Sequence, residues 1–212
     1  MPQLQDVEPA HYPPPPWQFT GQMWTGLFRN SAPRPLPAGL KHVLDPHLFL
    51  VSVVRYLDGP LHYDELFFGT PAWLGMRPGI HVDEMWVDSV SSLWGGRRIW
   101  GLPKNLAQFT WQRSTLSVSD SIGQIAKIEL NLNPSPLPWL WFSPPEFGHR
   151  DQSWLYFWSS IWGRFDLAPM QILEWSDRYP PLSHEKSILS VGAKPFRMNI
   201  PAPTVIQPSG QG

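Results

Sequence analysis

The segment GRRIWGLPKNL, residues 96–106, carries the strongest indication of fold and chemistry in this chain. It sets one lysine, Lys104, close to Trp100, Leu102 and Pro103. An ordinary lysine has a pKa near ~10.4 and is protonated at pH 7, whereas burial in apolar surroundings can lower a lysine pKa by up to ~3–5 pH units. The neutral amine is a nucleophile that can form a Schiff base with a carbonyl compound. The alternative interpretation is a loop lysine whose stem lies on Trp100 and whose ammonium group stays in water.

This segment resembles the lysine motif of the acetoacetate decarboxylase family, in which a glycine–arginine pair is followed by an apolar turn, a proline and the lysine. Upstream, GPLHYDEL, residues 59–66, is similar to the family's segment with the active-site glutamate, and Glu65 takes that position. PWQF at residues 16–19 and KPF at residues 194–196 also fall where family members have comparable segments. The resemblance covers most of the chain, about residues 17–205.

Both the resemblance and the residues favour a β-rich fold. The resemblance implies an α+β protein, predominantly antiparallel β with a few short helices, closed into a cone-like β-barrel that holds the active site inside. The 26 prolines favour strand edges, turns and loops, because proline breaks helices. Runs of β-branched and aromatic residues predict strands over residues 48–56, 62–70, 80–87, 106–111, 115–118, 122–132, 170–175 and 188–191, with 196–200 as a further candidate.

Two segments are predicted to be helical, and two lie outside the main domain. Residues 88–94 have Asp88 or Ser89 as a candidate N-cap, and the strongly aromatic residues 153–162 are the second helix candidate. Residues 1–16 end in four prolines and predict a stiff N-terminal arm, packed on the domain or offered as an SH3-type ligand. Residues 17–205 form the acetoacetate decarboxylase-like domain, and residues 206–212, rich in Gln, Ser and Gly, are an expected flexible tail.

Composition excludes several classes of function. The 212 residues suffice for one domain with its own core. A formal net charge of −1 with 16% charged residues gives no electrostatic footprint for nucleic acid or an anionic membrane. The absence of cysteine excludes disulfides, thiolate metal sites and cysteine nucleophiles. The sequence shows no secretory signal and no apolar run near the ~20 residues that span a bilayer. We therefore expect a cytoplasmic protein with no nucleic-acid or membrane partner.

The candidate catalytic residues are Lys104 and Glu65. Strand alternation would place Tyr63, Glu65 and Phe67 on one face. A carboxylate that shares a face with two aromatic residues lies at a rim or in a pocket, and in a pocket it can carry protons to and from a Schiff base. The alternative is a solvated strand carboxylate without a role in chemistry.

The substrate-binding candidates include two departures from the family pattern. The family's reactive lysine is followed by a second lysine, which here is Asn105. An arginine on the family's first strand corresponds to Gln22, and the nearest arginine, Arg29, needs a register shift to serve. Arg97 can bind a carboxylate bidentately or act as scaffold. The full set of substrate-binding candidates is Gln22, Arg29, Tyr63, Arg97, Trp100 and Asn105.

Two functional hypotheses follow. The first is a cofactor-independent lyase in which Lys104 forms a Schiff base with a keto acid or related carbonyl substrate, followed by decarboxylation, aldol or dehydration chemistry. The second is a family member without imine chemistry, whose tryptophan-lined cavity binds an apolar natural product as carrier, cyclase or isomerase. We expect no metal and no organic cofactor. The tryptophan-rich residues 139–142 and 154–162 are expected at the cavity wall or a subunit interface of a homo-oligomer.

Overall fold

The computed structural model describes residues 7–130 and 135–207. Most of the described chain is strand. No helix in these two ranges is long and apolar enough to cross a membrane. The elements are β1 (Trp17–Arg29), β2 (Leu40–His42), β3 (Leu48–Asp58), β4 (Tyr63–Leu74), β5 (Arg77–Val87), α1 (Val90–Gly95), the π-helical turn η2 (Gly96–Trp100), β6 (Lys104–Leu106), β7 (Gln108–Gln112), β8 (Thr115–Ser119), β9 (Gln124–Leu130), β10 (Ser135–Phe142), β11 (Pro145–Arg150), β12 (Ser153–Trp158), β13 (Ser160–Leu167), β14 (Met170–Trp175), β15 (Leu189–Ile200) and β16 (Thr204–Ile206).

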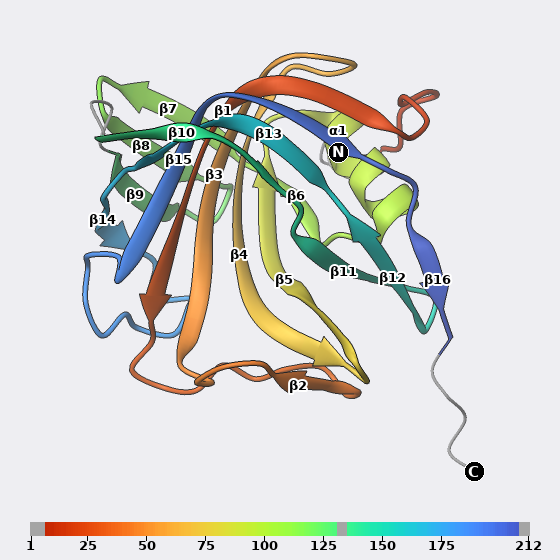
Figure 1. The fold of residues 1–212 in the computed structure, drawn as a ribbon, viewed down its shortest axis with the longest axis horizontal. Helices are drawn as coiled ribbons and strands as arrows, with labels where there is room; N and C mark the ends of the chain where they lie inside the picture. Colours follow the sequence, from red (N-terminus) through yellow and green to blue (C-terminus); the bar gives the residue numbers. More distant parts are fainter. Residues whose placement is uncertain (1–6, 131–134, 208–212) are drawn as a thin grey trace.

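The strands form two sheets. The large sheet has 12 strands in the order β10-β13-β15-β1-β3-β4-β5-β11-β12-β16, with β2 beside β4 and β6 beside β5. The small sheet has four strands in the order β14-β9-β8-β7. Strand β5 pairs in parallel with β6 and β11, whereas the other pairings of the large sheet are antiparallel. Figure 1 shows β1, β3, β4 and β5 side by side, with the small sheet on one side of them and α1 on the other.

The large sheet curls around an interior cavity. Side chains of the central strands β1, β3, β4 and β5 line this cavity together with side chains of β10 and β12, which lie near opposite ends of the pairing order. The order itself begins at β10 and ends at β16. The predominantly antiparallel β-fold is therefore confirmed, and the closure of the sheet into a barrel stays a prediction.

The two faces of strand β1 contact different parts of the protein. Met23, Thr25 and Leu27 point to the cavity, whereas Trp24 and Phe28 on the opposite face are buried against the small sheet. This follows from the two-residue period of a strand, which sends alternate side chains to opposite faces. A sheet covered on both faces can be apolar on both, so strong alternation of apolar and polar residues is not required.

The sequence predicted eight of the 16 described strands and misjudged the segment 153–162. That segment is not a helix: it contains β12 and the start of β13. Its aromatic residues suit strands, in which large rings pack across neighbouring strands, and β12 pairs with β11 and β16. Strand β1 was not predicted from its pattern, because Gly21 and Gly26 interrupt it. At Gly21 a Cβ atom would lie 1.9 Å from the carbonyl oxygen of Arg55, so the neighbouring strand β3 excludes a side chain there.

The described part of the N-terminal arm lies on the domain. Trp17 donates a hydrogen bond from its indole nitrogen to the carbonyl oxygen of Pro13 at 2.8 Å. Glu8 pairs with Arg98 of η2 at 2.7 Å. Helix α1 has Ser89 as its N-cap, one of the two predicted caps, with the Ser89 hydroxyl accepting from the Ser92 backbone nitrogen. The expected tail, residues 206–212, falls mostly outside the described residues. Its first residue, Ile206, belongs to β16 and pairs with Trp154 of β12.

Gly101 allows the loop before β6 to lie directly against β11. This residue follows η2 with φ +66°, in the left-handed region that favours glycine. The backbone nitrogen of His149 donates to the Gly101 carbonyl oxygen at 2.9 Å, and a Cβ atom on Gly101 would lie 2.9 Å from the backbone of His149. The close contact fixes the position of β11 relative to the segment that carries Lys104.

We expect Gly101→Ala to destabilise the protein more than Gly75→Ala. Gly75 has a similar φ of +60°, but a Cβ atom there would meet nothing within 4 Å. Gly75→Ala should therefore cost only the left-handed strain of about 1 kcal/mol, and Gly101→Ala should cost roughly 1–3 kcal/mol more for the displaced backbone. Urea unfolding of the two variants measures the difference, and equal costs would contradict the proposed role of this contact.

Candidate active site

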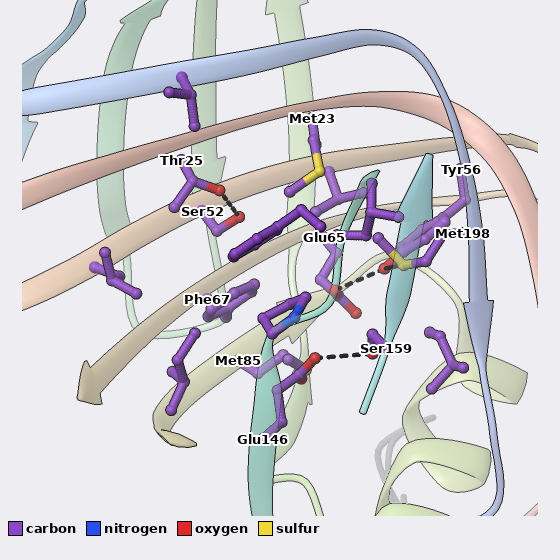
Figure 2. Close-up of a pocket in the computed structure, with 18 of the residues that line it drawn as sticks. Met23, Thr25, Ser52, Tyr56, Glu65, Phe67, Met85, Glu146, Ser159 and Met198 are labelled. Carbon is purple, nitrogen blue, oxygen red and sulfur yellow. Dashed lines mark hydrogen bonds between the residues drawn. The ribbon is translucent and has the colours of Figure 1, made fainter. Parts of the chain in front are cut away.

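The cavity inside the curled sheet has a volume of about 510 Å³. Its lining is mostly apolar, with Met23, Leu27, Phe67 and Met85 among the residues that face it. Figure 2 shows the polar side chains Thr25, Ser52, Tyr56, Glu65, Glu146 and Ser159 on the same lining. Polar groups are therefore few and face a largely apolar space, which is the usual composition of a small-molecule site.

Lys104 and Glu65 meet in this cavity. The Lys104 Nζ lies 2.7 Å from Glu65 Oε2 and 3.0 Å from the Oγ of Ser92, to which it also donates. Only 3% of Lys104 and 4% of Glu65 is exposed, so the ion pair is withdrawn from bulk water. An amine and a carboxylate at this distance can exchange a proton directly.

Three separate elements position the lysine. Strand β6 carries Lys104 beside Met85 of β5, and α1 supplies Ser92. Gly96 lies against the lysine stem, since a Cβ atom there would come 2.5 Å from Lys104 Cδ. Arg97 donates from Nε to the Lys104 carbonyl oxygen at 2.7 Å, so it holds the backbone of the lysine segment.

Glu65 is held from β4 and from the neighbouring strand β3. Tyr63, Glu65 and Phe67 all face the cavity, as strand alternation predicts. The Tyr56 hydroxyl of β3 donates to Glu65 Oε1 at 3.2 Å (Figure 2). The Tyr63 ring lies 5.1 Å from Lys104 Nζ, in cation–π range. Burial raises the pKa of Tyr56 and of Tyr63 well above the usual value, with the Glu65 charge adding to the effect, so both phenols stay neutral.

A second carboxyl group, Glu146 of β11, faces the same cavity and was not predicted from the sequence. The Ser159 hydroxyl donates to Glu146 Oε1 at 2.9 Å (Figure 2). The side chain is partly accessible because it faces the open cavity. Burial raises the pKa of Glu146 to about 7, while the Ser159 hydrogen bond opposes the increase. The sequence feature that could have drawn attention to Glu146 is that no other acidic residue lies between residues 130 and 150.

The structure brings some of the predicted site residues together and places others elsewhere. Lys104, Glu65, Tyr63 and Trp100 line the cavity, whereas Gln22, Arg29, Arg97 and Asn105 do not belong to its lining. Gln22 precedes the cavity-facing Met23 on β1, so strand alternation directs it to the opposite face of the sheet.

The predicted arginines make other contacts. Arg29 pairs with Asp45 at 2.7 Å near the surface. Arg97 Nη2 donates to Asn105 Oδ1 at 3.1 Å, so Asn105 belongs to the support of the lysine segment. Among the lining residues that the structure describes, Lys104 is the only cation.

The tryptophans lie at the cavity wall, at its rim and in a separate buried cluster. Trp17 and Trp100 line the cavity and pack edge to face at 4.7 Å. Trp141 and Phe142 of β10 also line it, yet they are 65% and 51% exposed, so β10 forms a rim of the cavity. Trp154 is buried in a separate cluster with Phe147.

The described residues include no group of three or more His, Asp or Glu side chains arranged to hold a metal ion. The lining side chains that carry hydrogen-bonding or charged groups are hydroxyls, three indoles, two carboxyls and one amine. The chemistry that these groups can supply is proton transfer and nucleophilic attack by an amine.

Comparison with known proteins identifies related folds. A family model for acetoacetate decarboxylase (ADC) matches residues 1–136. A search of curated proteins finds no significant match. A crystal structure of acetoacetate decarboxylase from Legionella pneumophila subsp. pneumophila str. Philadelphia 1 is similar at a TM-score of 0.72 and 18% identity, covering 92% of this chain and 88% of that chain.

Two further solved structures share the fold. The enduracididine biosynthesis enzyme MppR, complexed with the condensation product of pyruvate and imidazole 4-carboxaldehyde, has a TM-score of 0.61 at 14% identity, covering 93% of this chain and 92% of that chain. An acetoacetate decarboxylase-like enzyme from Sphingomonas wittichii RW1 has a TM-score of 0.60 at 17% identity, covering 91% of this chain and 93% of that chain. At these identities the likeness concerns the fold.

The buried ion pair predicts strongly non-additive effects on stability. Lys104→Met or Glu65→Gln alone leaves one buried charge without its partner and should cost about 3–5 kcal/mol at pH 7. The double variant removes both charges, so its cost should fall short of the sum by about 2 kcal/mol or more. Denaturant unfolding measures the cycle.

The matched control is the exposed pair Lys127–Glu174, whose side chains are 38% and 54% exposed. The same cycle on that pair should give a coupling below about 1 kcal/mol. Additivity at Lys104 and Glu65 would show that the two charges do not depend on each other.

Proposed function

We propose that this chain, which belongs to the acetoacetate decarboxylase family, is a cofactor-independent lyase-type enzyme. In this proposal Lys104 forms a Schiff base with a carbonyl compound, and Glu65 carries the protons. The observation that carries the proposal is the 2.7 Å contact between the Lys104 amine and the Glu65 carboxylate on the wall of the cavity. We also propose that the curled sheet acts as a closed cone, which would keep bulk water from the reacting atoms.

The covalent step balances without a further reagent. Lys104 passes a proton to Glu65, and the free amine attacks the carbonyl carbon while the carbonyl π pair moves onto oxygen. The oxygen departs as water with two protons, one from the nitrogen and one from a carboxylic acid of the site. The third proton remains on the iminium nitrogen. The iminium then accepts the electron pair of a breaking bond to the α-carbon, as decarboxylation, retro-aldol and dehydration chemistry require.

The lining favours a substrate whose unreactive part is apolar and uncharged. A substrate carboxylate would find no cation in the described lining besides Lys104, which already pairs with Glu65. An unpaired carboxylate in such surroundings is costly. Aldol or dehydration chemistry on an apolar ketone or aldehyde therefore suits this cavity better than decarboxylation of a small keto acid. The MppR complex with a pyruvate condensation product is an example of carbonyl chemistry on a similar fold.

A second candidate function keeps the lysine protonated. The buried ion pair and the apolar lining also suit a carrier, cyclase or isomerase that binds an apolar natural product without an imine. Lys104 would then be a cationic hydrogen-bond donor. The two functions differ in one measurable property, which is the formation of a covalent adduct on Lys104.

We expect reductive trapping to give an adduct on Lys104. The protein is incubated with 4-phenyl-2-butanone or with pyruvate and sodium cyanoborohydride, and its intact mass is measured. The neutral ketone should be trapped faster than pyruvate, because its apolar body fits the lining. Lys104→Arg should give no adduct, since guanidinium stays protonated and cannot form an imine. No adduct in the wild type with either compound would overturn the Schiff-base proposal and favour the second candidate.

We further propose that the protein is a homo-oligomer that associates through β10. This strand ends the pairing order of the large sheet and exposes 48% of Trp139 and 65% of Trp141. Trp139 stacks on Trp162 of β13 at 5.8 Å, which widens the apolar surface. An exposed apolar surface of this kind favours burial against another chain, and a second copy is the expected occupant.

Trp139→Glu should therefore shift the protein towards the monomer. A charge placed in an apolar contact is costly to bury, whereas Met76→Glu serves as a control, because Met76 lies in the β4–β5 turn and is 92% exposed. Sedimentation velocity of the wild type and both variants measures the change. A monomeric wild type would refute the proposed self-association.

A further inference from the structure

We infer that Glu146 is a second catalytic residue of this site, the acid that protonates the substrate oxygen and releases it as water. The inference rests on the proposed Schiff-base function. It assigns the proton-accepting role to Glu65 and the proton-donating role to Glu146. Figure 2 shows both carboxyl groups on the cavity lining, carried by the different strands β4 and β11.

The surroundings of the two carboxyl groups separate their roles. Glu65 accepts hydrogen bonds from Lys104 and from Tyr56, so both of its oxygens already face donors that stabilise the carboxylate. Glu146 accepts one hydrogen bond, from the Ser159 hydroxyl. Its nearest partners across the sheet, Ile80 and Phe157, are apolar. Two carboxyl groups in unlike surroundings can serve as base and acid of one reaction.

The charged and titratable groups that influence Glu146 are few. Burial is the main cause that raises its pKa to about 7, the charge of Glu65 adds to the increase, and the charge of Lys104 opposes it. Tyr56 also senses the charge of Glu146, but its own pKa lies well above the usual value. At neutral pH a substantial fraction of Glu146 therefore carries a proton that it can give away.

Other polar groups of the described lining are poorer acids. The Thr25 and Ser52 hydroxyls are hydrogen-bonded to each other at 2.8 Å (Figure 2). Ser190 donates to the Ala168 carbonyl oxygen at 2.6 Å. Hydroxyl groups are far weaker acids than a carboxylic acid, and the two phenols are weakened further by burial. Apart from Glu65, which is paired with Lys104, Glu146 is thus the one carboxyl group of the described lining.

The proton steps balance, with one proton leaving Glu146 and one arriving on Glu65. Lys104 has passed one proton to Glu65 before its nitrogen bonds to the carbonyl carbon, and the oxygen takes the Glu146 proton as the π pair moves onto it. The Glu146 carboxylate then removes one proton from the new ammonium centre and returns it to the hydroxyl oxygen. The C–O bond breaks, its electron pair leaves with the water, and the nitrogen lone pair forms the iminium. Glu146 ends as a carboxylate, and Glu65 holds the proton from Lys104.

The test compares trapping rates of the wild type and Glu146→Gln across pH. The probe is 4-phenyl-2-butanone. Cyanoborohydride is added at a concentration above which the trapping rate no longer rises, so that imine formation limits the rate. At pH 6, Glu146→Gln should react about 10²-fold more slowly, the lower range for loss of a general acid. The ratio of the two rates should fall towards one as the pH rises through about 7, because the wild type then loses the same proton.

Ser159→Ala provides the matched control. The Ser159 hydrogen bond stabilises the charged form of Glu146 and lowers its pKa. Its removal should shift the fall in the rate ratio to higher pH while the low-pH rate is retained. If Glu146 had only a structural role, the rate ratio would not fall with pH, and Ser159→Ala would not shift it.

Thermal melting checks the ionisation without any substrate. The folded pKa of Glu146, about 7, exceeds its ordinary value of 4.5. Ionisation therefore costs stability as the pH rises from about 4.5 to about 7. Glu146→Gln should melt at the wild-type temperature at pH 4.5 and a few degrees above it at pH 8. The same pattern shows that the variant is folded.

The outcomes separate this inference from the function on which it rests. An adduct that forms at the same rate in the wild type and in Glu146→Gln at pH 6 overturns the role of Glu146 alone. A slow variant whose ratio to the wild type does not change with pH also overturns it. If the wild type forms no adduct, both proposals fail, whereas the predicted pH-dependent ratio with a normally folded variant supports both.

Discussion

The burial of a lysine and a glutamate side by side is the constraint on which this structure depends. Two charges withdrawn from water are tolerated only when they pair closely and find further hydrogen bonds. Lys104 meets this condition with Glu65 and Ser92, and Glu65 with Tyr56. The partners come from α1, β3, β4 and β6, so the pair can form only when the helix and the curled sheet are assembled. The ion pair therefore requires the assembled fold, and the fold tolerates these two buried charges only because they are paired.

Close backbone contacts around the lysine segment make this assembly possible. Gly96 leaves room for the lysine stem, and Gly148 of β11 lies so near Trp100 that a Cβ atom would come 1.7 Å from its carbonyl oxygen. These contacts bring β11, and with it Glu146, to the wall of the cavity that holds Lys104. The same packing that buries the amine thus delivers a second carboxyl group. The departure from the family pattern at Asn105 fits this arrangement, since Asn105 supports the lysine segment through Arg97 instead of placing a charge in the cavity.

The composition of the cavity determines which substrates can be accommodated. Net charge in the lining is small, because the one described cation pairs with Glu65 and the second carboxyl is partly protonated near neutral pH. An apolar space of this kind stabilises neutral ligands through burial of their surface, at roughly 25 cal/mol per Å². The exposed aromatic residues of β10 extend the apolar lining to the rim. The proposed binding of an apolar carbonyl compound and the proposed self-association therefore both depend on the apolar character of β10.

The sequence by itself determined the local features of this protein. Runs of β-branched and aromatic residues predicted half of the strands, Ser89 was one of two predicted caps of α1, and alternation placed Tyr63, Glu65 and Phe67 on one face. These features depend on neighbours in the chain, and the motif resemblance supplied the family. The tertiary structure alone decided that residues 153–162 are strands, that Gln22 and Arg29 lie outside the cavity lining, and that Glu146 faces Lys104's cavity. The physical reason is that strand pairing, sheet curvature and burial join residues far apart in sequence, and no local pattern records which distant strand a segment will meet.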